Sequence, residues 1–357
     1  MHTITPPIFD GHNDTLIHLS LPDRGQGRSF FEASTLGHID LPRAKAGGLR
    51  GGLFAIFTPG NPEISKADQQ EEVIIHGGKK VQMAKAIEYQ YAYNHVNATI
   101  NYLDNLVNES NGKVLLATDA AQLEDAVAQE KLAIVLHIEG CEAIDPDLEN
   151  LHAFYQRGLR SLGPVWSRPT IFAHGVPFMF KQTPDTGPGL TPLGFRLINE
   201  AAKLKMHIDC AHLNEAGFWD IEKLGVTPMV TSHAGAFSIC PKARNITDQQ
   251  LDAIKATDGI VGVNFYVADL RPDGKNDPDN TPVTAIVRHI IYIADRIGID
   301  HVGFGSDFDG ASIPTELKDA AGLPKLIDAL KARGITGNDL EKVTHKNWMR
   351  VLKTCWT

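Results

Sequence analysis

The sequence predicts an α/β fold of the (β/α)8 barrel type, in which eight parallel strands alternate with helices. Short runs of β-branched and apolar residues alternate with longer segments of helical periodicity, and each run stops abruptly at polar residues or glycine. Eight such runs occur, which is the number that closes a barrel of this type. The length of 357 residues fits one barrel domain, residues 1–357, with insertions.

The expected strands are short, and the first, fourth and fifth are weak by propensity alone. In chain order they cover 8–9, 52–57, 133–138, 159–162, 207–208, 229–231, 260–263 and 302–304. Helices are expected over 81–107, 120–129, 191–205, 248–257 and 282–296, with a packing helix in 340–356. Two stretches, 21–46 and 164–189, interrupt the alternation, and their Gly, Ser and Pro content predicts long loops on the functional face.

The overall charge points to a small-molecule partner. The chain carries 34 Lys+Arg against 43 Asp+Glu, a formal net charge of −9, so it has no diffuse positive field that would hold nucleic acid or an anionic membrane. The N-terminal segment has no basic region followed by a continuous apolar run, and no apolar stretch is long enough to cross a bilayer. We therefore expect a cytoplasmic protein.

The four cysteines do not indicate a metal or disulfide framework. They are far apart in the sequence and form no CxxC pair, which argues against a zinc ribbon and favours free thiols. The 15 histidines are more informative, because several of them follow expected strands.

Residues that follow the strands of a barrel gather on one face, where such folds build their sites. The first run ends in His12 and Asp14, two residues apart and therefore on the same side of an extended segment, where they can share one metal ion. Because an HxD pair arises easily by chance, solvated loop residues are the alternative from this segment alone.

Glu139 stands at the end of the third run, where an unpaired buried carboxylate would be costly. It needs a cation, and its two oxygens suit a bridge between two metal ions. An arginine partner is the alternative reading of this segment.

Histidines follow two successive strands, at His212 and His233, and this repetition is the strongest signal for a metal site. Taken with the two side chains after the first run and Glu139, they supply enough nitrogen and oxygen ligands for two metal ions. His137 and His207 lie inside strands and are expected to be structural or to support the ligands.

The last run is followed by Asp307, which we expect to act as the general acid/base. A carboxylate beside a metal-activated water can accept a proton during attack and deliver it to a leaving amine. Asp309, two residues later, is expected to be a structural loop cap.

Seven segments, in this order and at these intervals, resemble those of the renal (membrane) dipeptidase family within the amidohydrolase-like barrels. They are FDGHND, HIEGCEAI, DCAH, TSHAGA, KARNITDQQL, GVNFY and GFGSDFDG, and together they cover nearly the whole chain. The resemblance implies that His12 and Asp14 bind one zinc ion, that His212 and His233 bind the other, and that Glu139 bridges them.

The resemblance also implies that Arg244 holds the carboxylate of the substrate and that Tyr266 lines the pocket. Alone, Arg244 would be read as a surface residue and Tyr266 as a core residue. The family further implies a homodimer.

One position departs from the pattern of the family. Where the family usually has a histidine that polarises the substrate carbonyl, this chain has Trp166, whose indole donates one N–H and cannot act as an imidazolium. His174, eight residues later in the same loop, is the hypothetical replacement.

The predicted function is hydrolysis of the peptide bond of dipeptides, L,D-dipeptides included, by hydroxide held between two Zn2+ ions. Two alternatives remain open from the sequence. One is a related amidohydrolase that acts on another amide or a lactone, since the same metal chemistry serves several carbonyl groups. The other is a catalytically silent barrel that lost its chemistry with the histidine.

Overall fold

A closed barrel of parallel strands forms the centre of the molecule in the computed structural model, which describes residues 6–357. Its strands, in order around the barrel, are β1 (Ile8–Asn13), β2 (Leu49–Phe57), β6 (Leu132–Glu139), β7 (Leu159–Gly163), β8 (His207–Ile208), β9 (Val230–Ala234), β10 (Ile260–Val263) and β11 (Val302–Phe304). A parallel bridge between Asp209 and Val230 joins β8 to β9 and closes the ring. The predicted fold class and the eight predicted strands are thus confirmed.

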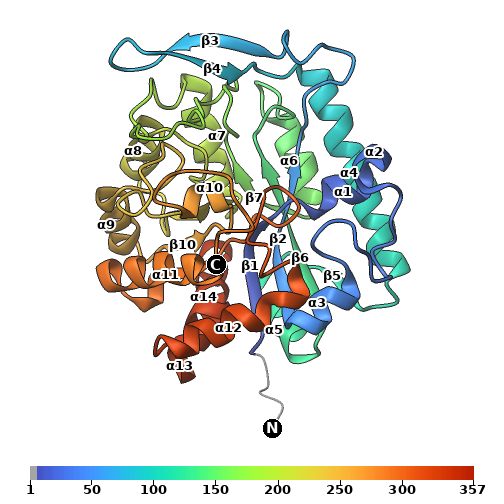
Figure 1. Cartoon of the computed structure of the whole chain (residues 1–357). Helices are drawn as coiled ribbons and strands as arrows, with labels where there is room; N and C mark the ends of the chain where they lie inside the picture. Colours follow the sequence, from blue (N-terminus) through green and yellow to red (C-terminus); the bar gives the residue numbers. More distant parts are fainter. Residues whose placement is uncertain (1–5) are drawn as a thin grey trace.

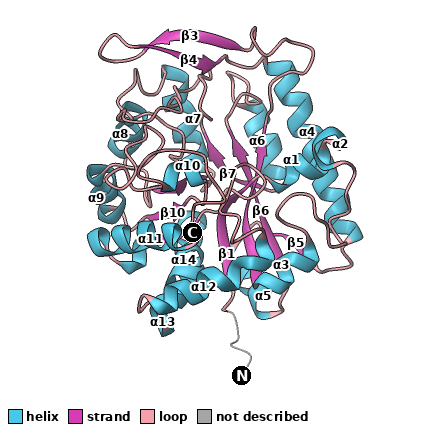
Figure 2. Ribbon diagram, viewed as in Figure 1, coloured by secondary structure: helices cyan, strands magenta, loops and turns pink. Residues whose placement is uncertain are grey.

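Helices surround the strands on the outside of the barrel (Figures 1 and 2). They are α1 (Thr15–Ser20), α2 (Pro22–Gly25), α3 (Leu41–Gly47), α4 (Tyr89–Glu109), α5 (Ala120–Ala128), α6 (Glu149–Gln156), α7 (Pro192–Lys203), α8 (Glu215–Lys223), α9 (Asp248–Ala256), α10 (Val267–Leu270), α11 (Thr284–Ile297), α12 (Leu323–Ala332), α13 (Gly337–Glu341) and α14 (Asn347–Trp356). The short strand β5 (Val114–Leu116) pairs with β6 outside the ring.

The first part of the helix expected over 81–107 is instead a strand. β3 (Gln70–Ile74) and β4 (Lys80–Ala84) form an antiparallel hairpin, and α4 begins only at Tyr89. Along β4, Val81 and Met83 are buried while Lys80 and Gln82 are exposed, and this period of two fits a strand rather than a helix. The hairpin lies at the top of Figure 1, at the opposite end of the molecule from α12 and α13.

The two expected long loops differ from each other. Residues 164–189 form no helix or regular strand, as predicted. The stretch 21–46 was expected to be a loop throughout, but it contains α2 and most of α3. At the start of α3 the side chain of Asp40 accepts a hydrogen bond from the backbone N–H of Arg43, which caps the helix.

Apolar side chains fill one part of the barrel. Phe9, Leu53, Val135 and Ile260 pack there with Trp348 of α14, whose indole N–H donates to the carbonyl of Phe304 at 2.8 Å. Polar side chains gather instead where the strands end. This division leaves the carboxyl ends of the strands free to build a site, as in other barrels of this type.

Candidate active site

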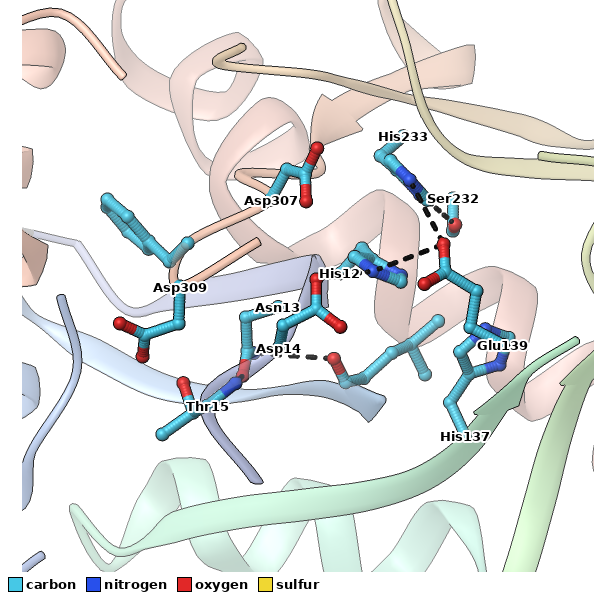
Figure 3. Close-up of polar contacts among 12 residues, drawn as sticks. His12, Asn13, Asp14, Thr15, His137, Glu139, Ser232, His233, Asp307 and Asp309 are labelled. Atoms are coloured by element: carbon cyan, nitrogen blue, oxygen red, sulfur yellow. Dashed lines mark hydrogen bonds and ion pairs between the residues drawn. The ribbon is translucent and has the colours of Figure 1, made fainter. Parts of the chain in front are cut away.

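Six polar side chains from five different strand ends converge in the structure. They are His12 in β1, Asp14 directly after β1, Glu139 from β6, His212 after β8, His233 from β9 and Asp307 after β11. Figure 3 shows most of them facing a common centre. Four of the six border a cavity of about 310 Å³: Asp14, Glu139, His212 and Asp307. The structure therefore brings together side chains that are far apart in the sequence, from His12 to Asp307.

One oxygen of Glu139 lies at the centre of this cluster. Its Oε1 is 3.1 Å from Nε2 of His212, 3.5 Å from Nε2 of His233 and 3.7 Å from Nε2 of His12. Nε2 of His12 is also 3.5 Å from Oδ2 of Asp14. Three imidazoles and two carboxylates thus present ligand atoms to one small volume.

Several of these atoms have no hydrogen-bond partner although they are buried. Both ring nitrogens of His12, Oδ1 of Asp14 and Oε1 of Glu139 are in this state. Leaving such atoms unpaired away from water is costly, and a bound cation removes the cost. Nitrogen and carboxylate ligands in this number suit zinc or a similar divalent ion.

The pKa shifts within the cluster also indicate a site for cations. Burial lowers the pKa of His12, but the carboxylates of Glu139 and Asp14 outweigh it and raise that pKa to about 10. Burial raises the pKa of Glu139 well above its usual value and lowers the pKa of His212 and of His233 well below theirs. Without a cation the cluster would have to bind protons to balance its charge, and divalent ions would provide that balance.

His212 and His233 face the cluster with Nε2, and each ring is oriented by a hydrogen bond at its Nδ1. The hydroxyl of Ser232 donates to Asp209 at 2.5 Å, so it accepts from Nδ1–H of His233 at 2.8 Å. Nε2 of His233 therefore carries a lone pair that faces the cluster. Nδ1 of His212 bonds similarly to Ser167 at 2.8 Å, and such partners fix the ring of a metal-binding histidine.

His137 and His207, expected to be structural or to support the ligands, share one hydroxyl. Ser161 Oγ lies 2.8 Å from Nδ1 of His137 and 2.6 Å from Nδ1 of His207. The ring of His137 also makes an edge contact with His12, at 5.7 Å between centroids. His137 therefore supports the cluster from inside the barrel.

Asp307 is held in an uncommon backbone conformation beside the cluster. Its φ is +57°, in the left-handed region that non-glycine residues seldom adopt and that is frequent at functional sites. Its carboxylate accepts a hydrogen bond from Asn264 at 3.1 Å, and burial together with the nearby carboxylate of Asp14 raises its pKa to about 7. A side chain at Gly310 would collide with the carboxylates of Asp14 and Asp307, so glycine is required there.

The whole chain matches one protein family. The model of the membrane dipeptidase family, peptidase family M19, matches residues 3–356. The chain belongs to this family. It is accordingly a metallo-dipeptidase, a hydrolase that acts on peptide bonds.

None of the helices between residues 6 and 357 combines the length and apolar character needed to cross a bilayer.

Related proteins match most of the chain or nearly all of it. An uncharacterised protein in the pqqA 5′ region of Klebsiella pneumoniae is 48% identical over 254 residues, which are 71% of this chain and 93% of that one. A metallopeptidase from Rhodobacter sphaeroides, solved with a phosphinate mimic of the dipeptide L-Ala-D-Ala, is 39% identical with a TM-score of 0.91 and covers 99% of this chain and 100% of its own. The solved M19 dipeptidase AC is 40% identical with a TM-score of 0.90, over 99% of both chains.

The other side chains that line the cavity include a buried arginine and several aromatic rings. Arg244, which sequence alone would place on the surface, is only 4% exposed and donates to the carbonyl of His233 at 2.8 Å. Tyr266, Trp166 and Phe178 also border the cavity. The ring of Trp166 lies 5.8 Å from that of His212, so the indole flanks the metal-ligand cluster.

His174 is not among the residues that line the cavity. Its Nδ1 bonds to the carbonyl of Gly189 at 3.1 Å, and its own carbonyl accepts from the backbone N–H of Asn214. These contacts hold the ring against a neighbouring segment of the same loop, and the cavity is bordered by Trp166 and not by His174. In this structure His174 is therefore not among the residues that line the cavity, and its role as a replacement for the missing histidine stays a prediction.

Sequence analysis missed Asn264, which contacts Asp307 and borders the cavity. It follows β10 directly, so the rule that polar residues after a strand belong to the functional face would have selected it. Phe178 gave no such signal, because an aromatic residue in a Pro-rich loop is equally compatible with packing.

Proposed function

We propose that this metallo-dipeptidase hydrolyses dipeptides, L,D-dipeptides included, with two Zn2+ ions as cofactors. The ligand set supports the proposal: His12 and Asp14 would hold one ion, His212 and His233 the other, and Glu139 would bridge them. A structural neighbour with 39% identity was solved with a mimic of L-Ala-D-Ala, which supports the L,D substrate class.

The observation that carries the proposal is a buried cation beside a metal-ligand cluster in one small cavity. Arg244 is 4% exposed and borders the same cavity of about 310 Å³ as Glu139 and Asp307. This volume is at the lower end of the range for small-molecule pockets. A dipeptide would place its terminal carboxylate on Arg244 and its peptide bond next to the cluster, whereas a longer peptide would require more room.

Each protein group has a defined task in this reaction. When bound, the ions would polarise the scissile carbonyl and lower the pKa of a water molecule. Asp307 would take the proton of the attacking water and deliver it to the departing amine, while Asn264 keeps its carboxylate in place. Arg244 would fix the substrate by charge-assisted hydrogen bonds, and the aromatic walls would exclude bulk water.

The function is tested by measuring amino-acid release from a panel of L,L- and L,D-dipeptides. We expect release by the zinc-reconstituted protein, its loss after chelation, and its return when zinc is added. Asp307→Asn serves as the control for a contaminating peptidase. If the metal-loaded protein releases no amino acid from any dipeptide but cleaves esters or other amides, the dipeptide proposal is wrong.

Arg244→Met is expected to raise KM for dipeptides by about 10- to 100-fold, the value of a charge-assisted hydrogen bond of roughly 1.5–3 kcal/mol. The variant should also lose the preference for a dipeptide over its C-terminal amide, because the amide has no carboxylate to pair. Arg296→Met, at an exposed arginine paired with Asp252, is the matched control. An unchanged KM and an unchanged preference would remove Arg244 from substrate binding.

A further inference from the structure

A second buried carboxylate lies on the same turn as Asp307 and has no part in the reaction described so far. The side chain of Asp309 has an exposed fraction of 0%, although the residue borders the cavity. In Figure 3, Asp307 and Asp309 belong to one loop, and their carboxylates lie on different sides of it, with Asp309 turned away from the histidines. Asp309 therefore contacts other parts of the chain.

The first of these contacts is a reciprocal pair with His38. The backbone N–H of His38 donates to Oδ1 of Asp309 at 2.5 Å, and the backbone N–H of Asp309 donates to Nδ1 of His38 at 2.8 Å. A ring nitrogen that accepts a hydrogen bond carries no proton, so His38 is neutral, in agreement with the lowering of its pKa by burial. The 3.8 Å approach of Nδ1 to the Asp309 carboxylate is consequently not an ion pair.

Arg28 supplies the opposite charge. Its side chain is 3% exposed, its Nη2 lies 3.5 Å from Oδ2 of Asp309, and its Nη1 donates to the carbonyl of Ile39 at 2.7 Å. Gly37, at φ +61°, passes so close that a Cβ there would lie 2.7 Å from Oδ1 of Asp309 and 2.8 Å from Nη2 of Arg28. The chain segment that contains Arg28, Gly37 and His38 is therefore closely fitted around the Asp309 carboxylate.

The turn that carries both carboxylates needs such support. Asp307 and Asp309 have φ values of +57° and +67°, and non-glycine residues in this region persist only where the surroundings enforce it. One end of the turn is fixed by the hydrogen bond from the N–H of Asp307 to the carbonyl of His12 at 3.0 Å. At the other end, Arg28 and His38 hold Asp309.

We propose that Arg28, His38 and Asp309 form a clamp that positions the carboxylate of Asp307 for proton transfer. Asp309 is a positioning residue in this scheme, because it acts through the backbone of the turn and not on the substrate. The inference rests on the proposed function, since it needs a reaction in which Asp307 protonates the leaving amine. A displacement of a reacting group by about 1 Å can cost about 100-fold in rate.

The test compares the hydrolysis of an amide with that of an ester, because the amine leaving group of the amide must be protonated and the alkoxide leaving group of the ester depends less on protonation. Asp309→Asn is expected to lower kcat for L-Ala-D-Ala by about 10- to 100-fold, with KM within about threefold and zinc content unchanged. The depsipeptide L-alanyl-D-lactate should lose less activity, because its alkoxide leaving group depends less on protonation than an amine does. A merely structural role would affect both substrates equally.

A second variant covers the case in which the uncompensated Arg28 prevents Asp309→Asn from folding. The double variant Arg28→Met/Asp309→Asn buries no unpaired charge, and it should show the same unequal losses on the two substrates. Asp273→Asn, at an exposed acid paired with Arg271, is the control and should leave both rates unchanged.

Wild-type kcat on the dipeptide in a folded variant, or equal losses on both substrates, would overturn the clamp. Failure of the zinc-loaded wild-type protein to cleave any dipeptide would instead overturn the proposed function, and the clamp with it.

Discussion

Glu139→Gln is expected to abolish dipeptide hydrolysis and to deplete bound metal. Oε1 of Glu139 lies 3.1–3.7 Å from the Nε2 atoms of three histidines, so this one carboxylate serves both halves of the ligand cluster. An amide of the same shape has no negative charge and would turn either a weaker oxygen or an NH2 group toward the cations. Loss of an outer partner of a metal ligand costs about 10- to 100-fold, so loss of this central ligand should cost more than about 100-fold in kcat/KM.

The measurement combines kcat/KM for L-Ala-D-Ala with the metal content of the purified variant. Glu130→Gln, at an exposed glutamate just before β6 and therefore at the end of that strand opposite Glu139, is the matched control and should retain both. A Glu139→Gln protein with a full metal complement and unchanged kcat/KM would exclude Glu139 from the metal site.

Asp307→Asn is expected to lower kcat by about 10²- to 10⁴-fold while the metal ions stay bound, which is the usual range for removal of a general acid/base. Asparagine can occupy the same place and keep a hydrogen bond with Asn264, but it neither accepts nor delivers a proton at neutral pH. KM should change little, because the carboxylate of the substrate is held by Arg244 and not by Asp307.

Two comparisons sharpen the Asp307 prediction. The loss should exceed that of Asp309→Asn, since removal of the proton carrier is more severe than its displacement. It should also be smaller for L-alanyl-D-lactate than for L-Ala-D-Ala. A variant that retains wild-type kcat on the dipeptide would show that the proton passes through another group.

The metal-ligand cluster was accessible to sequence analysis because a barrel converts a local pattern into a spatial one. Parallel strands end at the same rim, so a polar residue directly after an apolar run is placed near every other such residue. His12, Glu139 and His233 each stand at a strand end, and the structure brings them together for this reason. Their role as metal ligands stays a prediction until metal is bound and measured.

Local sequence patterns gave the wrong secondary structure where a strand directly precedes a helix. Residues 81–84 continue into a long helical pattern, yet they pair with β3, because alternate burial of Val81 and Met83 against Ile75 decides the conformation. For His174, loop position and the missing histidine suggest a place near the cluster, but they do not fix where its ring lies in this structure. Its ring bonds to Gly189, a contact that loop length and composition do not encode.

By itself the sequence determined the fold class, the family and the strand ends that carry the ligands, since these depend on periodicity and on short motifs. Only the tertiary structure decided which groups support Asp307. His38 and Asp309 are 271 residues apart, and neither lies in a pattern that points to the other. Their reciprocal hydrogen bonds, and the buried charge of Arg28 beside them, arise only when the barrel closes and brings the segment after β1 against the turn after β11.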